Sequence, residues 1–255
     1  GLTRVMQGIN SSNFLRELVP GDSFETPEAV LCCSDEGFGG LSARMHTFVL
    51  DHIVPPYWRG RPRPVLYNSW EGCMFDFNHS KLVKLAKEAK SLGCELFVLD
   101  DGWFGHRDTD TCSLGDWYVD KKKLPNGLDG LAKRIHQEGL KFGLWFEPEM
   151  ISPDSDLYRA HPDWCIHVPE RVNSIGRNQY ILDMTRKDVR DNIYEQMCAI
   201  LSNNKIDYVK WDFNRNISEA GSALLPAERQ QEFFHRFVLG TYELMGRIVD
   251  TFPHI

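Results

Sequence analysis

The chain has 255 residues, of which 42% are hydrophobic and 25% are charged, as is usual for one large or two small globular domains. Its 29 basic and 36 acidic residues give a net charge of −7, which disfavours nucleic acid or an anionic membrane as a partner, because binding either one requires clustered lysine and arginine. No apolar run approaches the length of a membrane-spanning helix, so we predict no membrane partner.

Residues 1–58 differ in pattern from the rest of the chain. Residues 24–33 predict a strand, and residues 41–51 predict a helix or an extended arm. The Pro/Arg-rich stretch 55–64 then predicts a stiff linker. We therefore expect a first part that ends near this linker and a second domain over residues 59–255.

From residue 65 onward, strand signals alternate with helix signals. Short apolar runs that are each followed by a helical pattern are typical of buried parallel strands. This alternation predicts an α/β fold, namely a (β/α)8 TIM-type barrel of which about the first five β/α units are present, truncated before strand six. An open, doubly wound sheet is the alternative. The predicted strands lie at 65–70, 95–100, 141–147, 180–183 and 206–212.

Two of the predicted helices carry specific expectations. Thr185 is the expected N-cap of a helix over residues 189–201, because threonine side chains accept hydrogen bonds from the first free N–H groups of a helix. The last helix spans about residues 227–251. It is expected to bury the apolar side chains of Phe234, Phe237, Val238, Met245, Ile248 and Val249.

Acidic residues stand at the ends of four predicted strands. In a (β/α) barrel the loops that follow the strands converge on one rim, where active sites are found. Trp103, Trp145 and Trp211 lie next to these acids, and Trp103 offers an apolar wall for a pyranose ring. Carboxylates combined with flat aromatic side chains suit a neutral, polyhydroxylated substrate, so the pattern predicts a glycosidase. The acids are Asp100, Asp101, Glu147, Glu149, Asp183 and Asp212.

The sharpest motif is the sequence KWDFNR, which begins at Lys210. Asp212 lies where the strand meets its loop, and Lys210 shares its strand face. A neighbouring ammonium group keeps an aspartate ionised, as a nucleophile requires. The alternative is an aspartate that caps the strand or pairs with Arg215. Trp211 and Asn214 beside it favour the functional interpretation.

Three further residues are candidates for substrate binding. Trp70 ends the first predicted strand and Trp145 lies on the third, so both belong to the rim that carries the acids. Arg177 precedes the fourth predicted strand and can reach either a hydroxyl group or a carboxylate.

Cysteine and histidine spacing points away from metals and cofactors. The seven cysteines contain no C-x-x-C pair, and the nine histidines show no metal-binding spacing. Dinucleotide, P-loop and nucleophile-elbow signatures are also missing. We therefore predict no metal and no cofactor. Unpaired thiols favour a reducing, cytoplasmic location.

At this point the sequence shows a resemblance to a known family. Residues 65–255 resemble the catalytic domain of the glycoside hydrolase family 36 α-galactosidases. Residues 4–10 (RVMQGIN) and 24–31 (FETPEAVL) resemble the tail of the N-terminal β-sandwich domain of that family, which implies that residues 1–58 are the end of such a domain plus a linker. The matching catalytic blocks are NSWE (68–71), LDDGWF (99–104), GLWFEPEM (143–150), RAHPDW (159–164), RNQYILDMT (177–185) and KWDFNR (210–215).

The resemblance implies an activity and a set of site residues. It implies a retaining α-galactosidase that releases terminal α-linked galactose from raffinose-type oligosaccharides. The aspartate of the family motif KWDxNR is the nucleophile, which corresponds to Asp212. By their match to the family motifs, the galactose-binding residues are Asp100, Asp101, Trp145, Arg177, Lys210, Trp211 and Asn214, and we add Trp70 to this set.

The second carboxyl group of the mechanism has no assigned residue. A retaining glycosidase uses two carboxyl groups about 5–5.5 Å apart, one of which serves as acid and then as base. In the family this aspartate lies in a glycine-rich G-R-F-D context beyond the fifth barrel helix, and the chain contains no such segment. Glu147 and Glu149 lie on the expected rim, but the resemblance supports neither. We expect a segment of a longer, homo-oligomeric protein, a dimer or tetramer, and no activity from the segment alone.

Other functions are compatible with the same sequence features. An α-N-acetylgalactosaminidase or a galactosyl transglycosidase of the same family uses a closely similar site. A metal-dependent lyase of enolase-like design also places acids on successive barrel strands and uses lysine bases. A third possibility is a non-catalytic, sugar-binding remnant.

Overall fold

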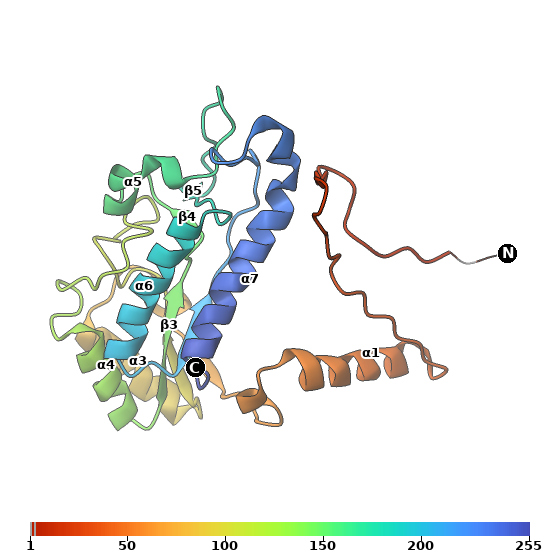
Figure 1. Ribbon diagram of the computed structural model, residues 1–255. Coiled ribbons are helices and arrows are strands. Elements are labelled where there is room, and N and C mark those ends of the chain that lie inside the picture. The colour runs from red at the N-terminus through yellow and green to blue at the C-terminus, as the bar shows by residue number, and fades with distance from the viewer. Residues whose placement is uncertain (1, 3) are drawn as a thin grey trace.

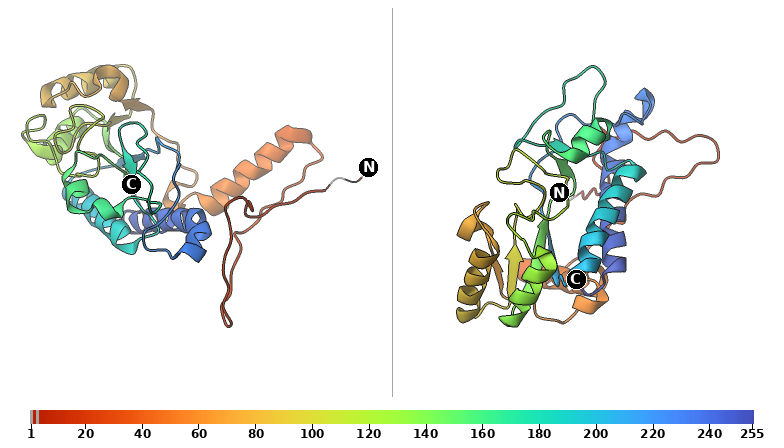
Figure 2. Two further views of the ribbon diagram at one scale, coloured as in Figure 1. Left: turned by 90° about the horizontal axis from the view of Figure 1, so that it is seen from above. Right: turned by 90° about the vertical axis from the view of Figure 1, so that its left-hand side faces the viewer.

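Residues 2 and 4–255 are described by a computed structural model of the chain (Figure 1). From about residue 66 to the C-terminus, the chain forms an α/β body in which helices pack around a parallel sheet. The preceding residues form an extended arm and one helix, which project from one side of this body (Figure 2). Among the helices of the described residues, none has the length and apolar character needed to cross a membrane.

The main sheet has four parallel strands in the order β1-β2-β3-β6. Every residue of β2 and all but the first of β3 are buried, because helices cover the sheet, and this explains their uninterrupted apolar sequences. The α/β fold with a parallel sheet is confirmed, as are four of the five predicted strands. The strands are β1 (Leu66–Asn68), β2 (Leu96–Leu99), β3 (Lys141–Phe146) and β6 (Tyr208–Trp211).

The prediction of a fifth parallel strand at residues 180–183 is wrong. This segment forms β5 (Tyr180–Ile181), which pairs antiparallel with β4 (Met150–Ile151) in a separate two-stranded ladder. The backbone N–H of Leu182 donates to the carbonyl of Glu149 at 2.7 Å, so the segment satisfies its hydrogen bonds outside the main sheet. The place beside β3 is taken by β6. The described residues therefore contribute four, not five, strands to the parallel sheet.

Helices cover the sheet, and two of them begin at another residue than predicted. The last α-helix, α7 (Phe233–Thr251), starts after residue 227, because residues 227–232 form a 3₁₀ turn. The helix α6 begins at Lys187, after Arg186 as its N-cap residue, rather than at Thr185. The hydroxyl of Thr185 donates to Asp183 Oδ1 at 2.6 Å, and the N-cap residue Arg186 makes no side-chain capping hydrogen bond, so the prediction that Thr185 caps this helix is wrong. The α-helices of the body are α2 (Trp70–Cys73), α3 (His79–Ser91), α4 (Gly127–Gln137), α5 (Asp156–Ala160), α6 (Lys187–Asn203) and α7 (Phe233–Thr251), with 3₁₀ turns η3 (Pro162–Trp164) and η4 (Ala227–Glu232).

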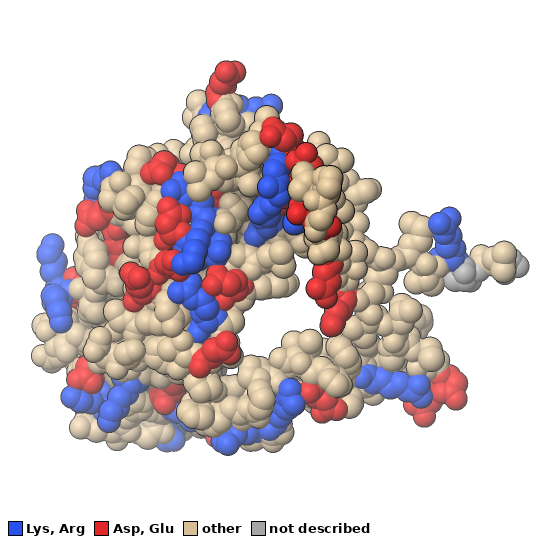
Figure 3. All heavy atoms as spheres, viewed as in Figure 1, with Lys and Arg blue, Asp and Glu red and all other residues tan. Residues whose placement is uncertain are grey.

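The long helices α6 and α7 lie side by side and are joined by ion pairs. Arg190 Nε lies 2.7 Å from Glu243 Oε2, and Arg247 Nη1 lies 2.7 Å from Asp191 Oδ1. Figure 3 shows the consequence on this face of the molecule, where acidic and basic side chains alternate over the two helices rather than separate into areas of one sign.

One side of α7 faces the body and the other faces outward. Phe237 and Ile248 are buried, as predicted. Phe234, Val238 and Val249 are 38%, 45% and 42% exposed, so the prediction that they are buried is wrong. The spacing of apolar residues alone does not distinguish the two sides, because this helix is apolar on both, and only the side that packs on the body excludes water.

The N-terminal arm contains α1 (Gly37–Phe48), the π-helical turn η1 (Val49–Ile53) and the 3₁₀ turn η2 (Pro56–Trp58). The helix agrees with the prediction of a helix or an arm over residues 41–51. The prediction of a strand at residues 24–33 is wrong, because in the described part of the chain this segment has no partner strand with which to form a ladder. That residues 1–58 form the end of a β-sandwich domain plus a linker stays a prediction.

Candidate active site

The acidic residues of the predicted site gather at one edge of the main sheet. Asp100 and Asp101 directly follow β2, and Asp212 directly follows β6. Glu147 directly follows β3, which lies between these two strands in the sheet. Because the strands are parallel, their carboxyl ends open on the same edge, where ligands bind in α/β sheets. The predicted convergence of these motifs on one edge is therefore present in the fold.

Asp212 is held by three hydrogen bonds. Its Oδ2 accepts from the indole Nε1 of Trp145 at 3.0 Å and from Nδ2 of Asn214 at 2.6 Å. Its Oδ1 accepts from the backbone N–H of Phe213 at 3.0 Å. The side-chain oxygen of Asn214 in turn accepts from Arg177 Nη1 at 3.1 Å. Four of the predicted site residues thus form one connected group that fixes the carboxylate in a single orientation.

Asp100 and Lys210 form a second connected pair. Lys210 Nζ lies 2.8 Å from Asp100 Oδ2, so the lysine of β6 reaches across to the end of β2. Asp100 Oδ1 accepts from the backbone N–H of Asp101 at 2.8 Å, and the backbone N–H of Asp100 donates to Ser69 Oγ at 3.0 Å. Lys210 lies opposite Trp145 in the register of β3 and β6. Because Trp145 also donates to Asp212, the Asp100–Lys210 pair and the Asp212 group are neighbours at this edge.

Asp101 pairs with a residue that the sequence did not indicate. Arg107 donates from Nε to Asp101 Oδ1 at 2.9 Å and from Nη2 to Asp101 Oδ2 at 2.8 Å. Both side chains are buried. The only sequence signal for this pair is the position of an arginine six residues after the aspartate, in the loop that follows β2, and no periodic pattern marks such a residue.

Glu147 is buried beside the nucleophile candidate. Its Oε1 accepts from Gln179 Nε2 at 3.1 Å. Burial raises the pKa of Glu147 to about 7, with a smaller contribution from the negative charges of Asp212 and Asp101, while the hydrogen bonds from Gln179 and Asn214 act in the opposite direction. Gln179 is a further site residue that motif reasoning missed.

Glu149 is fully buried and bound to Trp211. The indole Nε1 of Trp211 donates to Glu149 Oε1 at 2.5 Å, and the other carboxyl oxygen has no hydrogen-bond partner. Burial raises the pKa of Glu149 to about 8. Trp211 also lines an apolar cavity of about 670 Å³ between the sheet and α7.

The other tryptophans differ in their access to a ligand. Trp103 is fully buried and donates from Nε1 to the Trp145 carbonyl at 2.9 Å, so the prediction that its ring forms a wall for a sugar is wrong. Trp145 is only 2% exposed, and its contact with the site is its hydrogen bond to Asp212. Trp70 is half-buried and packs edge-on against Phe75, with ring centroids 5.0 Å apart.

In the part of the chain that the structure describes, no group of three or more His, Cys, Asp or Glu side chains has the arrangement of a metal site.

Comparisons with known proteins agree on one family. The family model described as Melibiase matches residues 23–255. The chain is 54% identical to α-galactosidase AgaA of Geobacillus stearothermophilus and 51% identical to α-galactosidase Mel36A of Lactobacillus acidophilus, and both alignments cover the whole chain and 35% of the relative. A crystal structure of a variant of AgaA in complex with raffinose has 54% sequence identity, a TM-score of 0.94, and coverage of 97% of this chain and 34% of that one. The chain therefore spans about a third of the length of these relatives.

Proposed function

The chain belongs to the Melibiase family, and on this premise we propose that it carries the nucleophile and the galactose-binding residues of a retaining α-galactosidase. The observation that carries the proposal is the environment of Asp212, whose carboxylate accepts hydrogen bonds from Trp145 and Asn214 at the carboxyl edge of the sheet. Such a fixed carboxylate suits attack on an anomeric carbon.

In the proposed reaction, Asp212 forms a bond to the anomeric carbon of galactose while the glycosidic bond to the leaving sugar breaks. A second carboxyl group protonates the leaving oxygen and later removes a proton from the water that releases galactose from Asp212. The contacts of Trp145 and Asn214 to Oδ2 orient the carboxylate for this attack. The ammonium group of Lys210 and the carboxylate of Asp100, which are paired at 2.8 Å, offer a donor and an acceptor to sugar hydroxyl groups.

Neither buried glutamate suits the role of the second carboxyl group. Glu149 is fully buried and bonded to Trp211, and Glu147 is almost as buried and bonded to Gln179. A general acid must reach the leaving oxygen within hydrogen-bond distance, so burial argues against both. We therefore propose that a polypeptide of residues 1–255 alone does not hydrolyse raffinose efficiently.

The proposed substrate class is that of raffinose-type oligosaccharides. It is supported by the crystal structure of the AgaA variant in complex with raffinose, to which the chain is 54% identical in sequence. It is also supported by the site chemistry, since the paired carboxylate of Asp100 and ammonium group of Lys210 offer an acceptor and a donor to the hydroxyl groups of a neutral sugar.

The test is an assay of galactose release from raffinose by the complete gene product. The Asp212→Asn variant should lose nearly all activity, because an amide is not a nucleophile for this reaction. The matched control is Asp207→Asn. Asp207 lies just before β6, at the end of the strand opposite to Asp212, and its side chain contacts His136 and accepts a hydrogen bond from the backbone N–H of Phe142. Wild-type protein without activity, or a folded Asp212→Asn variant that keeps wild-type activity, would refute the proposal.

A further inference from the structure

Arg107 is a buried charge that the proposed reaction does not use. It lies in the loop between β2 and α4 and is only 2% exposed. Its guanidinium group donates to both oxygens of Asp101, at 2.9 Å and 2.8 Å. A bidentate contact of this kind fixes the plane of a carboxylate as well as its position.

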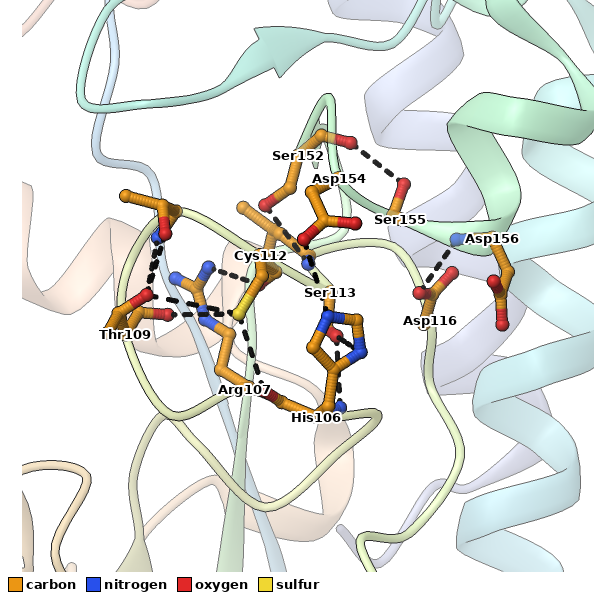
Figure 4. Close-up of polar contacts among 12 residues, drawn as sticks. His106, Arg107, Thr109, Cys112, Ser113, Asp116, Ser152, Asp154, Ser155 and Asp156 are labelled. Carbon is orange, nitrogen blue, oxygen red and sulfur yellow. Dashed lines mark hydrogen bonds and ion pairs between the residues drawn. The ribbon is translucent and has the colours of Figure 1, made fainter.

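Arg107 is itself held in place at both ends. Its Nη1 donates to the carbonyl of Cys112 at 2.8 Å, as Figure 4 shows. Its own backbone carbonyl accepts from Lys123 Nζ at 2.8 Å, and the same ammonium group donates to the carbonyl of Gly102 at 2.9 Å. The guanidinium group is therefore part of a rigid arrangement rather than a mobile surface side chain.

The loop that carries Arg107 is also anchored to the segment after β4. The backbone N–H of Ser113 donates to the carbonyl of Asp154 at 2.7 Å, and the hydroxyl of Ser113 lies 2.7 Å from His106 Nδ1 (Figure 4). These contacts hold both ends of the turn from residue 106 to residue 113. Arg107 thus approaches Asp101 from a fixed direction.

The pair matters because Asp101 lies in an unfavourable environment for a negative charge. Burial raises the pKa of Asp101, the charge of Asp100 raises it further, and the hydrogen bonds and charge of Arg107 lower it. Glu147 is a second acidic group close enough to interact with Asp101. Arg107 is the cation that opposes these effects.

We propose that Arg107 is a positioning residue for sugar recognition, which acts by holding Asp101 ionised and oriented toward the substrate. A carboxylate has about four lone-pair positions. The guanidinium group of Arg107 occupies two of them and the backbone N–H of Gly102 contributes a further hydrogen bond, so one position stays free to accept from a sugar hydroxyl group. This inference rests on the proposed function, since it concerns the binding of galactose at the same edge of the sheet.

The test measures galactose affinity by calorimetry between pH 5.5 and pH 8 in the complete gene product. Arg107→Met keeps the volume of the side chain and removes its charge. We expect the affinity of this variant for galactose to fall by about tenfold at pH 7, which corresponds to the loss of one charge-assisted hydrogen bond between Asp101 and the sugar. The affinity should fall further relative to wild type as the pH is lowered, because Asp101 becomes protonated. Arg107→Lys keeps the charge without the bidentate contact and should lose about threefold, with the pH dependence of wild type.

Two control variants separate positioning from general stability. Arg134→Met removes an arginine that pairs with Glu138 at the end of α4 and has no contact with the loop of Arg107, so this variant should bind galactose as wild type does. Arg107→Met combined with Asp101→Asn should bind weakly without the added pH dependence, because the group that titrates is gone. If Arg107→Met does not fold, Arg107→Lys decides the question.

The outcomes distinguish this inference from the proposed function. Wild-type protein that does not bind galactose would overturn the proposed function and the inference with it. Wild-type protein that binds galactose, together with folded Arg107 variants of unchanged affinity and unchanged pH profile, would overturn only the role of Arg107.

Discussion

Replacing Trp145 by phenylalanine removes one specific contact of the candidate site. The indole Nε1 of Trp145 donates to Asp212 Oδ2 at 3.0 Å, and the residue is only 2% exposed, so water does not readily replace the lost donor. A hydrogen bond to a charged group contributes about 1.5–3 kcal/mol. If the bond is needed in the transition state, kcat/KM should fall by about 10- to 150-fold, since about 1.4 kcal/mol corresponds to a factor of ten in rate.

The assay compares kcat/KM for an aryl α-galactoside between wild type and Trp145→Phe in the complete gene product. Trp164→Phe is the matched control, because Trp164 is also buried but stacks on His161 away from Asp212, with ring centroids 3.9 Å apart. Thermal unfolding of each variant shows whether the change in ring size affects folding. A folded Trp145→Phe protein within twofold of wild type would refute the view that the indole orients the nucleophile.

Helix packing, the protonation of Glu149 and the second carboxyl group each give a further prediction. A Cβ at Gly240 would overlap the carbonyl oxygen of Met184, so Gly240→Ala should lower the free energy of unfolding by about 1–3 kcal/mol in urea titrations. The matched control is Gly246→Ala on the same helix, where a Cβ meets no atom within 4 Å, and this variant should raise the free energy of unfolding by up to about 1 kcal/mol. Equal effects of the two substitutions would contradict the packing of this helix. The pKa of Glu149 is raised from 4.5 to about 8, so the folded state keeps a proton that the unfolded chain has released above pH 5. The contribution of this group to stability therefore falls as pH rises from about 5 to 8, by at most about 1.4 kcal/mol per pH unit, and Glu149→Gln should unfold at higher urea than wild type at pH 8 but not at pH 5. A polypeptide of residues 1–255 alone should release galactose from raffinose at least 100-fold more slowly than the complete gene product, because general-acid catalysis typically contributes a factor of about 10²–10⁴ to the rate. Comparable rates would show that Glu147 or Glu149 serves as the second carboxyl group.

Sequence patterns located the edge of the sheet at which the candidate site lies. The runs that end in Asp100, Glu147 and Asp212 are strands β2, β3 and β6, and parallel strands bring their carboxyl ends to one edge. The same reasoning failed for residues 180–183. A run of a few apolar residues does not determine which segment it pairs with, and in the structure it pairs with β4 outside the main sheet.

The contacts between loops could not be derived from the sequence. Arg107 reaches Asp101 from an irregular loop, and Gln179 reaches Glu147 from the segment before β5, without a repeating pattern in either case. Trp103 shows a related limit. Its place beside the two aspartates suggested a surface for sugar binding, but tertiary packing buries it completely. A sequence motif therefore indicates which residues lie near the site, while side-chain packing decides which of them face the ligand.

The most direct test of Asp212 as the nucleophile is to identify the residue that becomes covalently attached to galactose. The protein is treated with a fluorinated galactosyl fluoride, whose leaving group departs without acid assistance and whose glycosyl-enzyme is hydrolysed slowly. Peptide mass spectrometry then locates the label. We predict one fluorogalactosyl group on Asp212 and none in the Asp212→Asn variant. A label on any other residue, or the same labelling in the variant, would contradict the assignment of Asp212 as the nucleophile.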